Sequence, residues 1–246
     1  RLADRSFAGA GRTDQGQDRA IGTAVLLHPA FGTELPHGDE LGDSILDVIE
    51  AGVELDRVVR SLILKHNYEG AGAFTGIPGS VGGAIFMNAG TVNGATADFL
   101  ESVDLVRPEG RATIATEPGL FAYRSQTFCT TRDLILGGVF RFVVSATDQR
   151  AVYRHYIERR REKQPQGPCC GSVFKNPPGQ HAGRLIESCG LKGVRQGGAV
   201  ISPVHANFIM NDHGASCADI LFLLNLCKER VLERFGILLE EEVRII

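Results

Sequence analysis

The sequence predicts an α+β fold, and three patterns support this class. Short strand-like runs lie between glycine-containing turns, a few longer segments have helical spacing, and strands and helices do not alternate as in parallel βαβ units. The chain has 246 residues, enough to bury a sizeable core in one large or two medium domains. No apolar run approaches the roughly 20 residues of a membrane span, so we expect no membrane partner.

Strands and one helix are predicted in the first part of the chain. Thr23–Leu27 and Ile45–Glu50 are strand candidates, and a hairpin is expected to join Val103–Val106 to Ala112–Ile114. Leu55–His66 carries apolar residues three and four positions apart, which is the spacing of an amphipathic helix.

The character of the sequence changes after Ala146. Before it, Leu134–Val144 is strongly β-forming, with Gly137–Gly138 as a candidate bulge. After it, the charged segment Asp148–Lys163 predicts a solvated connecting helix, in which Arg159–Arg161 is expected on the surface. We therefore expect two domains, residues 1–146 and a smaller α+β domain at residues 147–246.

The second domain should contain a strand around Phe208–Met210 and a helix over Ala218–Phe235 that stops at Gly236. The helix is expected to bury a broad apolar face made of Ile220, Leu221, Leu224, Leu226, Cys227, Val231 and Leu232.

Composition excludes several classes of function. The net charge of −3 gives no footprint for nucleic acid. Six cysteines are too sparse for a disulfide scaffold, so reduced thiols in a cytoplasm are expected. His181, His205 and His213 lack the short paired spacing of a metal site, and none is expected; His205 is interpreted as a structural, hydrogen-bonded residue.

Residues 72–90 contain six glycines and a Pro-Gly-Ser step. Glycine permits positive φ and lets the backbone approach a bulky ligand closely, so loop amides here could converge on an anion or a heteroaromatic ring. The segment has neither a dinucleotide-binding G-x-G-x-x-G before a helix nor the Lys-Ser/Thr of a P-loop. A glycine-rich turn that only packs is the alternative.

The order Gly-Ile-Pro-Gly-Ser-Val-Gly-Gly-Ala-x-x-Met-Asn-Ala-Gly over residues 76–90 resembles the flavin-contacting loop of UDP-N-acetylenolpyruvoylglucosamine reductases. The resemblance implies an FAD-binding domain of the PCMH, or vanillyl-alcohol-oxidase-like, type, followed by a substrate-binding domain. The residues that it implies for FAD contact are Gly76, Ile77, Pro78, Gly79, Ser80, Gly82, Gly83, Ala84 and Asn88.

A second motif, Tyr123-Arg124-Ser125-x-x-Phe128, resembles the family pattern Tyr-Arg-x-Ser-x-Phe, although Gln126 stands where the family has serine. A guanidinium suits a substrate carboxylate and the charge that moves onto it. The resemblance implies that Arg124 is catalytic and that Tyr123 binds substrate. In isolation, the arginine would be read as a surface residue.

The third motif is Gly-Ser-Val-Phe-Lys-Asn-Pro at residues 171–177. By composition it is a polar turn before a proline. In the family, a motif of this form carries the serine that protonates the substrate, which implies that role for Ser172; a hydroxyl can protonate a carbanion-like enolate of comparable basicity. Lys175, Asn176 and the earlier Lys163 match positions that bind substrate.

The C-terminal Leu-Glu-Glu-Glu-Val-Arg, residues 239–244, resembles the family's Leu-Glu-x-Glu-Val-Arg. An acidic run at a chain end is usually solvated. The resemblance implies that Glu242 lies beside the reacting carbons, where it holds or protonates the intermediate, and that Glu240 is its structural partner.

The resemblance extends from about residue 44 to the end, and the short interval between Arg124 and Ser172 is similar to the second of the two family types. It implies NADPH-dependent, FAD-mediated reduction of UDP-N-acetylglucosamine enolpyruvate for peptidoglycan synthesis. Hydride adds to C3 of the enolpyruvyl group and a proton to C2. The family's N-terminal pyrophosphate-binding lobe is expected to be missing here, and the 9–20 segment to be an insertion, so FAD binding and activity are expected to be weakened. Two alternatives stay open: another flavin oxidase of the same fold, and a paralogue without catalysis.

Overall fold

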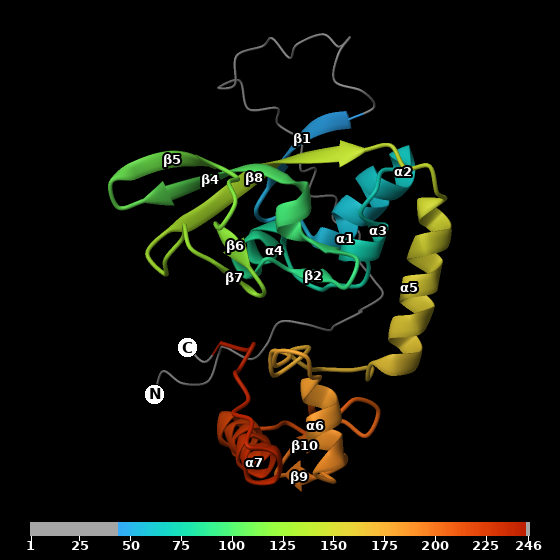
Figure 1. The fold of residues 1–246 in the computed structure, drawn as a ribbon, viewed down its shortest axis with the longest axis vertical. Helices are drawn as coiled ribbons and strands as arrows, with labels where there is room; N and C mark the ends of the chain where they lie inside the picture. Colours follow the sequence, from blue (N-terminus) through green and yellow to red (C-terminus); the bar gives the residue numbers. More distant parts are fainter. Residues whose placement is uncertain (1–43, 245–246) are drawn as a thin grey trace. The chain divides into compact units, whose positions relative to one another are not determined.

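The computed structural model describes residues 44–244. The strand expected at Thr23–Leu27 and the segment at residues 9–20 lie outside the described residues. Within the described part, no helix is long and apolar enough to cross a membrane. Figure 1 shows the order of the helices and strands along the chain. Buried apolar side chains form two clusters, one drawn from residues 49–142 and one from residues 173–239.

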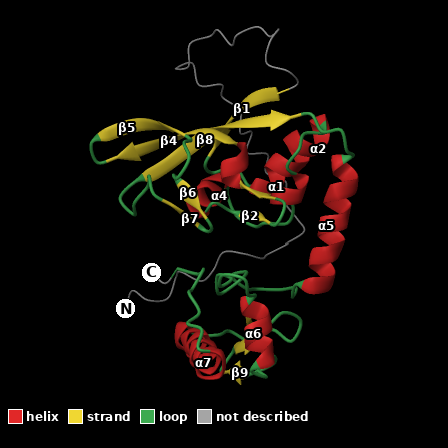
Figure 2. Ribbon diagram, viewed as in Figure 1, coloured by secondary structure: helices red, strands yellow, loops and turns green. Residues whose placement is uncertain are grey.

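A four-stranded antiparallel sheet organises the first cluster. Its order is β1-β8-β4-β5, so the last of these strands in sequence lies between the first two. Figure 2 shows the helices that follow β1 beneath one face of this sheet. The strands are β1 (Ser44–Glu50), β4 (Leu100–Arg107), β5 (Gly110–Ala115) and β8 (Leu134–Val143).

Glycines in β8 permit close strand pairing. A Cβ at Gly137 would lie 2.5 Å from the carbonyl oxygen of Ile49, and one at Gly138 would lie 2.8 Å from that of Ser102. The register between β4 and β8 shifts beside Gly137, so the predicted bulge is confirmed. The predicted hairpin and the strand at Ile45–Glu50 are also confirmed.

The helix predicted at Leu55–His66 is present but contains a wide turn. It consists of α1 (Leu55–Val58), a π-helical segment η1 (Val59–Ile63) and α2 (Leu64–His66), and Asn67 ends it with φ of +57°. Shorter elements follow: α3 (Ala71–Phe74), α4 (Val81–Met87), β2 (Gly90–Thr91), β3 (Gly94–Ala95), η2 (Thr96–Phe99), β6 (Phe121–Ala122) and β7 (Ser125–Gln126).

The connecting helix α5 (Gln149–Lys163) matches the prediction and is capped by Asp148, whose carboxylate accepts the N–H of Arg150 at 2.9 Å. A buried amide joins its first turn to the first domain: Gln149 accepts the N–H of Ala71 at 3.2 Å. Arg160 is half-buried, so the expectation that it lies on the surface is wrong.

The C-terminal part packs two helices on a three-stranded antiparallel sheet of order β11-β10-β9. The long helix α7 ends at Gly236 as predicted, but its buried face differs. Leu223 is fully buried and was not predicted, whereas Leu232 is 47% exposed. The elements are α6 (Ala182–Ser188), β9 (Arg195–Gln196), β10 (Ala199–Ile201), β11 (Ile209–Asn211) and α7 (Cys217–Phe235).

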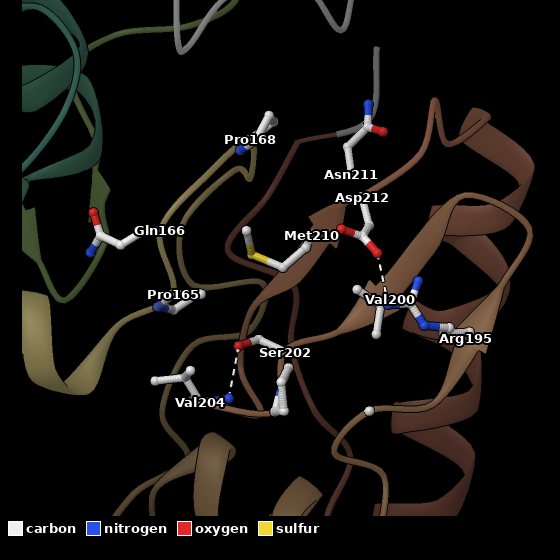
Figure 3. A pocket seen from close by; sticks show the side chains of 12 residues that line it. Pro165, Gln166, Pro168, Arg195, Val200, Ser202, Val204, Met210, Asn211 and Asp212 are labelled. Atoms are coloured by element: carbon white, nitrogen blue, oxygen red, sulfur yellow. Dashed lines mark hydrogen bonds and ion pairs between the residues drawn. The ribbon is translucent and has the colours of Figure 1, made fainter.

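A pocket of about 450 Å³ lies against this sheet (Figure 3). Pro165 and Met210 contribute to its lining, and an Arg195–Asp212 ion pair of 2.7 Å crosses its rim. None of the site residues predicted from the sequence is among the described residues that line it.

Candidate active site

The glycine loop, residues 76–83, is anchored to the turn that follows β1. The N–H of Val81 donates to the carbonyl of Val53, and the N–H of Gly82 donates to that of Ala51, both at 2.8 Å. A Cβ at Gly82 would lie 2.8 Å from the Cβ of Ala51. These two amides and this glycine therefore serve the packing of the loop.

Other parts of the loop remain open. Nothing lies within 4 Å of a Cβ built at Gly79, and one at Gly83 would meet only the Ser80 hydroxyl at 3.6 Å. Both glycines are exposed, and the amides of Gly79 and Ser80 donate to no acceptor in residues 44–244. A backbone with free amides and no side chains in the way fits the close approach of a flavin nucleotide.

Two residues expected to contact FAD point their side chains elsewhere. Ala84 is 4% exposed and belongs to the first core, so its side chain faces protein. The Asn88 amide donates to the carbonyl of Ala122 at 3.0 Å and accepts the N–H of Ala97 at 3.0 Å. FAD contact by Ala84 and Asn88 therefore stays a prediction, and Asn88 ties the end of α4 to the neighbouring hairpin.

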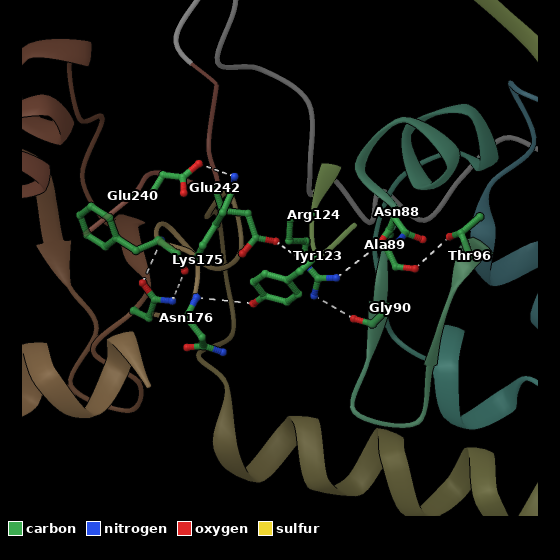
Figure 4. Close-up of polar contacts among 12 residues, drawn as sticks. Asn88, Ala89, Gly90, Thr96, Tyr123, Arg124, Lys175, Asn176, Glu240 and Glu242 are labelled. Atoms are coloured by element: carbon green, nitrogen blue, oxygen red, sulfur yellow. Dashed lines mark hydrogen bonds and ion pairs between the residues drawn. The ribbon is translucent and has the colours of Figure 1, made fainter. Parts of the chain in front are cut away.

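Arg124 is held by three acceptors (Figure 4). Its Nε donates to the Glu242 carboxylate at 2.7 Å, Nη2 to the carbonyl of Gly90 at 2.9 Å, and Nη1 to that of Asn88 at 3.3 Å. Both side chains of the ion pair are about four-fifths buried, being 18% and 20% exposed. Arg124 itself has φ of +54°, an uncommon conformation whose cost is typical of functional positions.

One neighbour of Arg124 is Gln126, the residue at which the motif departs from the family pattern. Gln126 makes two 2.7 Å bonds to the backbone N–H and carbonyl of Cys129, so it closes the turn after β7. Tyr123 is 52% exposed, its ring lies under the Arg124 guanidinium at 5.0 Å, and its hydroxyl is 3.5 Å from the N–H of Asn176.

Ser172 precedes a buried segment that is held by a distant amide. Asn207, 4% exposed, accepts the N–H of Phe174 at 3.0 Å and donates to its carbonyl at 2.8 Å, and its own carbonyl accepts the N–H of Val173. The half-buried Ser172 hydroxyl makes no hydrogen bond within the described residues. Sequence reasoning gave Asn207 no role; it lies in a turn before β11, and its only signal was its place in the stretch Ser202–Phe208, which resembles the family.

The C-terminal tail pairs with the same segment. The N–H of Glu242 donates to the carbonyl of Val173 at 2.8 Å, and the N–H of Lys175 donates to that of Glu240 at 2.9 Å. The Lys175 ammonium pairs with the Glu240 carboxylate. The tail therefore brings Glu242 to the segment that begins at Ser172 and to Arg124, although Glu240, its expected structural partner, pairs with Lys175 instead.

Two predicted substrate-binding residues lie at the margin of this arrangement. The Asn176 side chain accepts the N–H of Ala182 at 3.1 Å and so satisfies the first turn of α6. Lys163, the last residue of α5, is exposed and has no ion pair with any residue in the described range.

His205 is a structural residue in the observed geometry. Its Nδ1 accepts the N–H of Asn207 at 3.2 Å, and its ring lies edge-on to Phe208 at 4.9 Å. Burial, and secondarily the Lys192 ammonium, hold the pKa of His205 below its ordinary value.

The fold, the open glycine loop and two matching family models together define a flavin-dependent oxidoreductase. A family model described as an FAD binding domain matches residues 43–116, and a second one, the C-terminal domain of UDP-N-acetylenolpyruvoylglucosamine reductase, matches residues 163–246.

Similar proteins agree with this class. The chain is 38% identical over 242 residues to UDP-N-acetylenolpyruvoylglucosamine reductase from Anaeromyxobacter dehalogenans. This alignment covers 98% of the present chain and 72% of that protein. It is 41% identical to the reductase from Syntrophobacter fumaroxidans, in an alignment that covers 90% of the present chain and 64% of that protein. The crystal structure of the reductase from Thermus caldophilus superposes with a TM-score of 0.68 at 35% identity, covering 80% of this chain and 71% of that one.

The chain belongs to the UDP-N-acetylenolpyruvoylglucosamine reductase family. Members of this family are FAD-dependent oxidoreductases that use NADPH to reduce the enolpyruvyl group of UDP-N-acetylglucosamine enolpyruvate in peptidoglycan synthesis. The recognition made from the sequence is therefore confirmed. The chain spans 72% of the length of the first of these two relatives and 64% of the second.

Proposed function

We propose that Arg124, Ser172 and Glu242 carry out the proton-transfer and charge-stabilising part of this reduction on UDP-N-acetylglucosamine enolpyruvate. The observation that carries the proposal is the buried 2.7 Å contact between Arg124 and Glu242, made by a tail that also pairs with the segment following Ser172. Three motifs far apart in sequence thus meet through contacts within one chain.

Each residue has a role that its chemistry allows. FAD, when bound, supplies the hydride that it takes from NADPH. The Arg124 guanidinium binds the substrate carboxylate and stabilises the charge that develops there when C3 is reduced. Glu242 orients that guanidinium. The Ser172 hydroxyl, free of partners in the described residues, donates its proton to C2 of the enolate-like intermediate.

Among the described residues, the glycine loop would hold FAD, through the amides of Gly79 and Ser80, which have no acceptor there, and through the open faces of Gly79 and Gly83. Tyr123, Lys163 and Lys175 remain proposed contacts for the nucleotide-sugar substrate. The two separate cores support a division into domains 1–146 and 147–246. We place the protein in the cytoplasm, where reduced thiols persist.

The test separates the two half-reactions in rapid-mixing experiments on the full-length protein. The Ser172→Ala variant should be reduced by NADPH at the normal rate, as seen by bleaching of the flavin absorbance. Reoxidation by the enolpyruvyl substrate should slow by about 10²–10⁴-fold, the usual contribution of a positioned proton donor.

Ser188→Ala, an exposed serine on α6, is the matched control and should leave both half-reactions unchanged. If Ser172→Ala lost flavin reduction and kept reoxidation, the role given to Ser172 would be wrong. A purified protein without flavin absorbance even after reconstitution with FAD would support the non-catalytic paralogue instead.

A further inference from the structure

Arg160, in the last turn of α5, lies over the glycine loop. A Cβ built at Gly76 would be 2.5 Å from its Cδ and 2.9 Å from its Nε, so the side chain packs directly on this glycine. Gly76 also has φ of +71°. Glycine is required here both by conformation and by the closeness of the arginine. The loop proposed to hold FAD therefore has a guanidinium against it.

The charge of Arg160 is poorly compensated within the described residues. Of its five N–H groups, only one, on Nη1, has an acceptor in residues 44–244, namely the side-chain oxygen of Gln164 at 3.2 Å. No carboxylate in residues 44–244 pairs with it. Burial lowers the pKa of Arg160. The spare donors of this half-buried guanidinium are therefore available to a bound anion.

The neighbouring cations differ from Arg160. Arg159, Arg161 and Lys163 are exposed, as expected of a solvated helix face. The carbonyl groups at the end of α5 favour a cation there, which reduces but does not replace the need for a counter-ion. Only Arg160 combines burial, contact with the glycine loop and unused donors.

We propose that Arg160 is an anion-binding residue of the site and that its ligand is a phosphate of a nucleotide diphosphate. This inference rests on the proposed function, which brings two such groups to the site: the pyrophosphate of FAD and the diphosphate of the UDP-sugar. Both offer anionic oxygens that match the planar fork of a guanidinium.

The test measures binding, not turnover, so it does not depend on the role of Ser172. FAD is titrated into the full-length apoprotein and followed by flavin fluorescence, and UDP is titrated into the FAD-loaded protein and followed by the flavin difference spectrum. The variants are Arg160→Gln and Arg160→Lys, with Arg161→Gln as the control that removes the same charge from an exposed position of the same helix.

Arg160→Gln should lower the affinity for one of the two ligands by at least tenfold, about 1.4 kcal/mol, while Arg160→Lys should keep part of that affinity. A weaker FAD complex identifies the cofactor phosphate, and weaker UDP binding to the loaded protein identifies the substrate phosphate. The affinity of Arg160→Gln for that ligand should also depend less on salt concentration than the affinity of the unmodified protein. If Arg160→Gln and Arg161→Gln bound both ligands alike, the proposal would be overturned, and Arg160 would only pack its aliphatic chain on Gly76. Circular dichroism and the thermal midpoint verify that each variant is folded.

Discussion

The glycine loop and the segment around Ser172 are both parts of the candidate site, but they are held in place differently. The loop is contiguous in sequence and is fixed by the turn just before it, through Val53 and Ala51. The segment after Ser172 is fixed by Asn207 and by the chain's own tail, which are far away in sequence. Damage to the loop should therefore act locally, whereas damage to a distant partner should disturb the Ser172 side.

Arg124 joins the two regions, so its replacement should have the largest effect. Arg124→Lys keeps the charge and the backbone conformation, but a lysine cannot reach Glu242, Asn88 and Gly90 together. We expect the substrate half-reaction to slow by roughly 10²–10³-fold, the cost of losing a positioned donor. Single-turnover reoxidation with the enolpyruvyl substrate measures this directly.

Lys228→Arg is the control for a conservative change of a cation that pairs with the tail, at Glu241, outside the Arg124 contacts. It should cost far less than Arg124→Lys. Equal rates for the two variants would mean that the three contacts of Arg124 do not matter for the reaction.

Asn207→Ala should have the next largest effect, and it should act on the Ser172 side alone. The change leaves the N–H and carbonyl of Phe174, a residue 1% exposed, without partners. We expect a loss of about 2–3 kcal/mol in the free energy of unfolding and slower reoxidation by substrate, with normal FAD affinity. Urea unfolding and FAD titration measure the two quantities.

Asn225→Ala on the exposed side of α7 is the matched control and should change neither quantity. A large drop in FAD affinity for Asn207→Ala would show that the two regions are not independent.

Ser80→Ala tests the local side of the comparison. Its hydroxyl caps α4 by accepting the N–H of Gly83, and caps of this kind contribute about 1 kcal/mol. The variant should weaken FAD binding by a few fold. Ser216→Ala removes the capping box of α7. It should lower the thermal midpoint about as much as Ser80→Ala does, but should leave the affinity for FAD unchanged. Identical FAD titrations for the two variants would argue against a role of the loop in flavin binding.

The difference between regions held by local contacts and regions held by distant ones also explains what the sequence could predict. The glycine loop, the hairpin at Val103–Ile114 and the helix at Gln149–Lys163 depend on local spacing and on turn residues, and these elements were predicted. The family and its catalytic candidates were identified because each motif is contiguous, although the roles of individual site residues stay proposals.

Contacts between distant residues were not predictable from one sequence. Nothing local distinguishes Asn207 from a polar residue at a strand end, or shows that Glu240 pairs with Lys175 while Glu242 pairs with Arg124. Arg160 looks like its two arginine neighbours in sequence; its burial results from packing against Gly76. The exposure of Leu232 and the burial of Leu223 likewise depend on where α7 meets the sheet and α6.

The smallest expected effect concerns pH and the support of Asn207. Because burial lowers the pKa of His205 in the folded protein, the unfolded chain binds its proton first as pH falls below the ordinary value of about 6.5. The stability from neutral His205 is therefore complete above that pH and is lost as pH falls through the lower, folded pKa. Protonation of Nδ1 would also remove the acceptor for the N–H of Asn207.

His205→Asn keeps an acceptor that does not titrate. The free energy of unfolding of this variant should therefore fall less steeply than that of the unmodified protein between pH 6.5 and 5, by at most about 1 kcal/mol per pH unit. Urea unfolding across this range measures the slope, with His155→Asn on the exposed side of α5 as the control. A slope equal to that of the unmodified protein would show that His205 contributes nothing to the acid sensitivity of the Ser172 region.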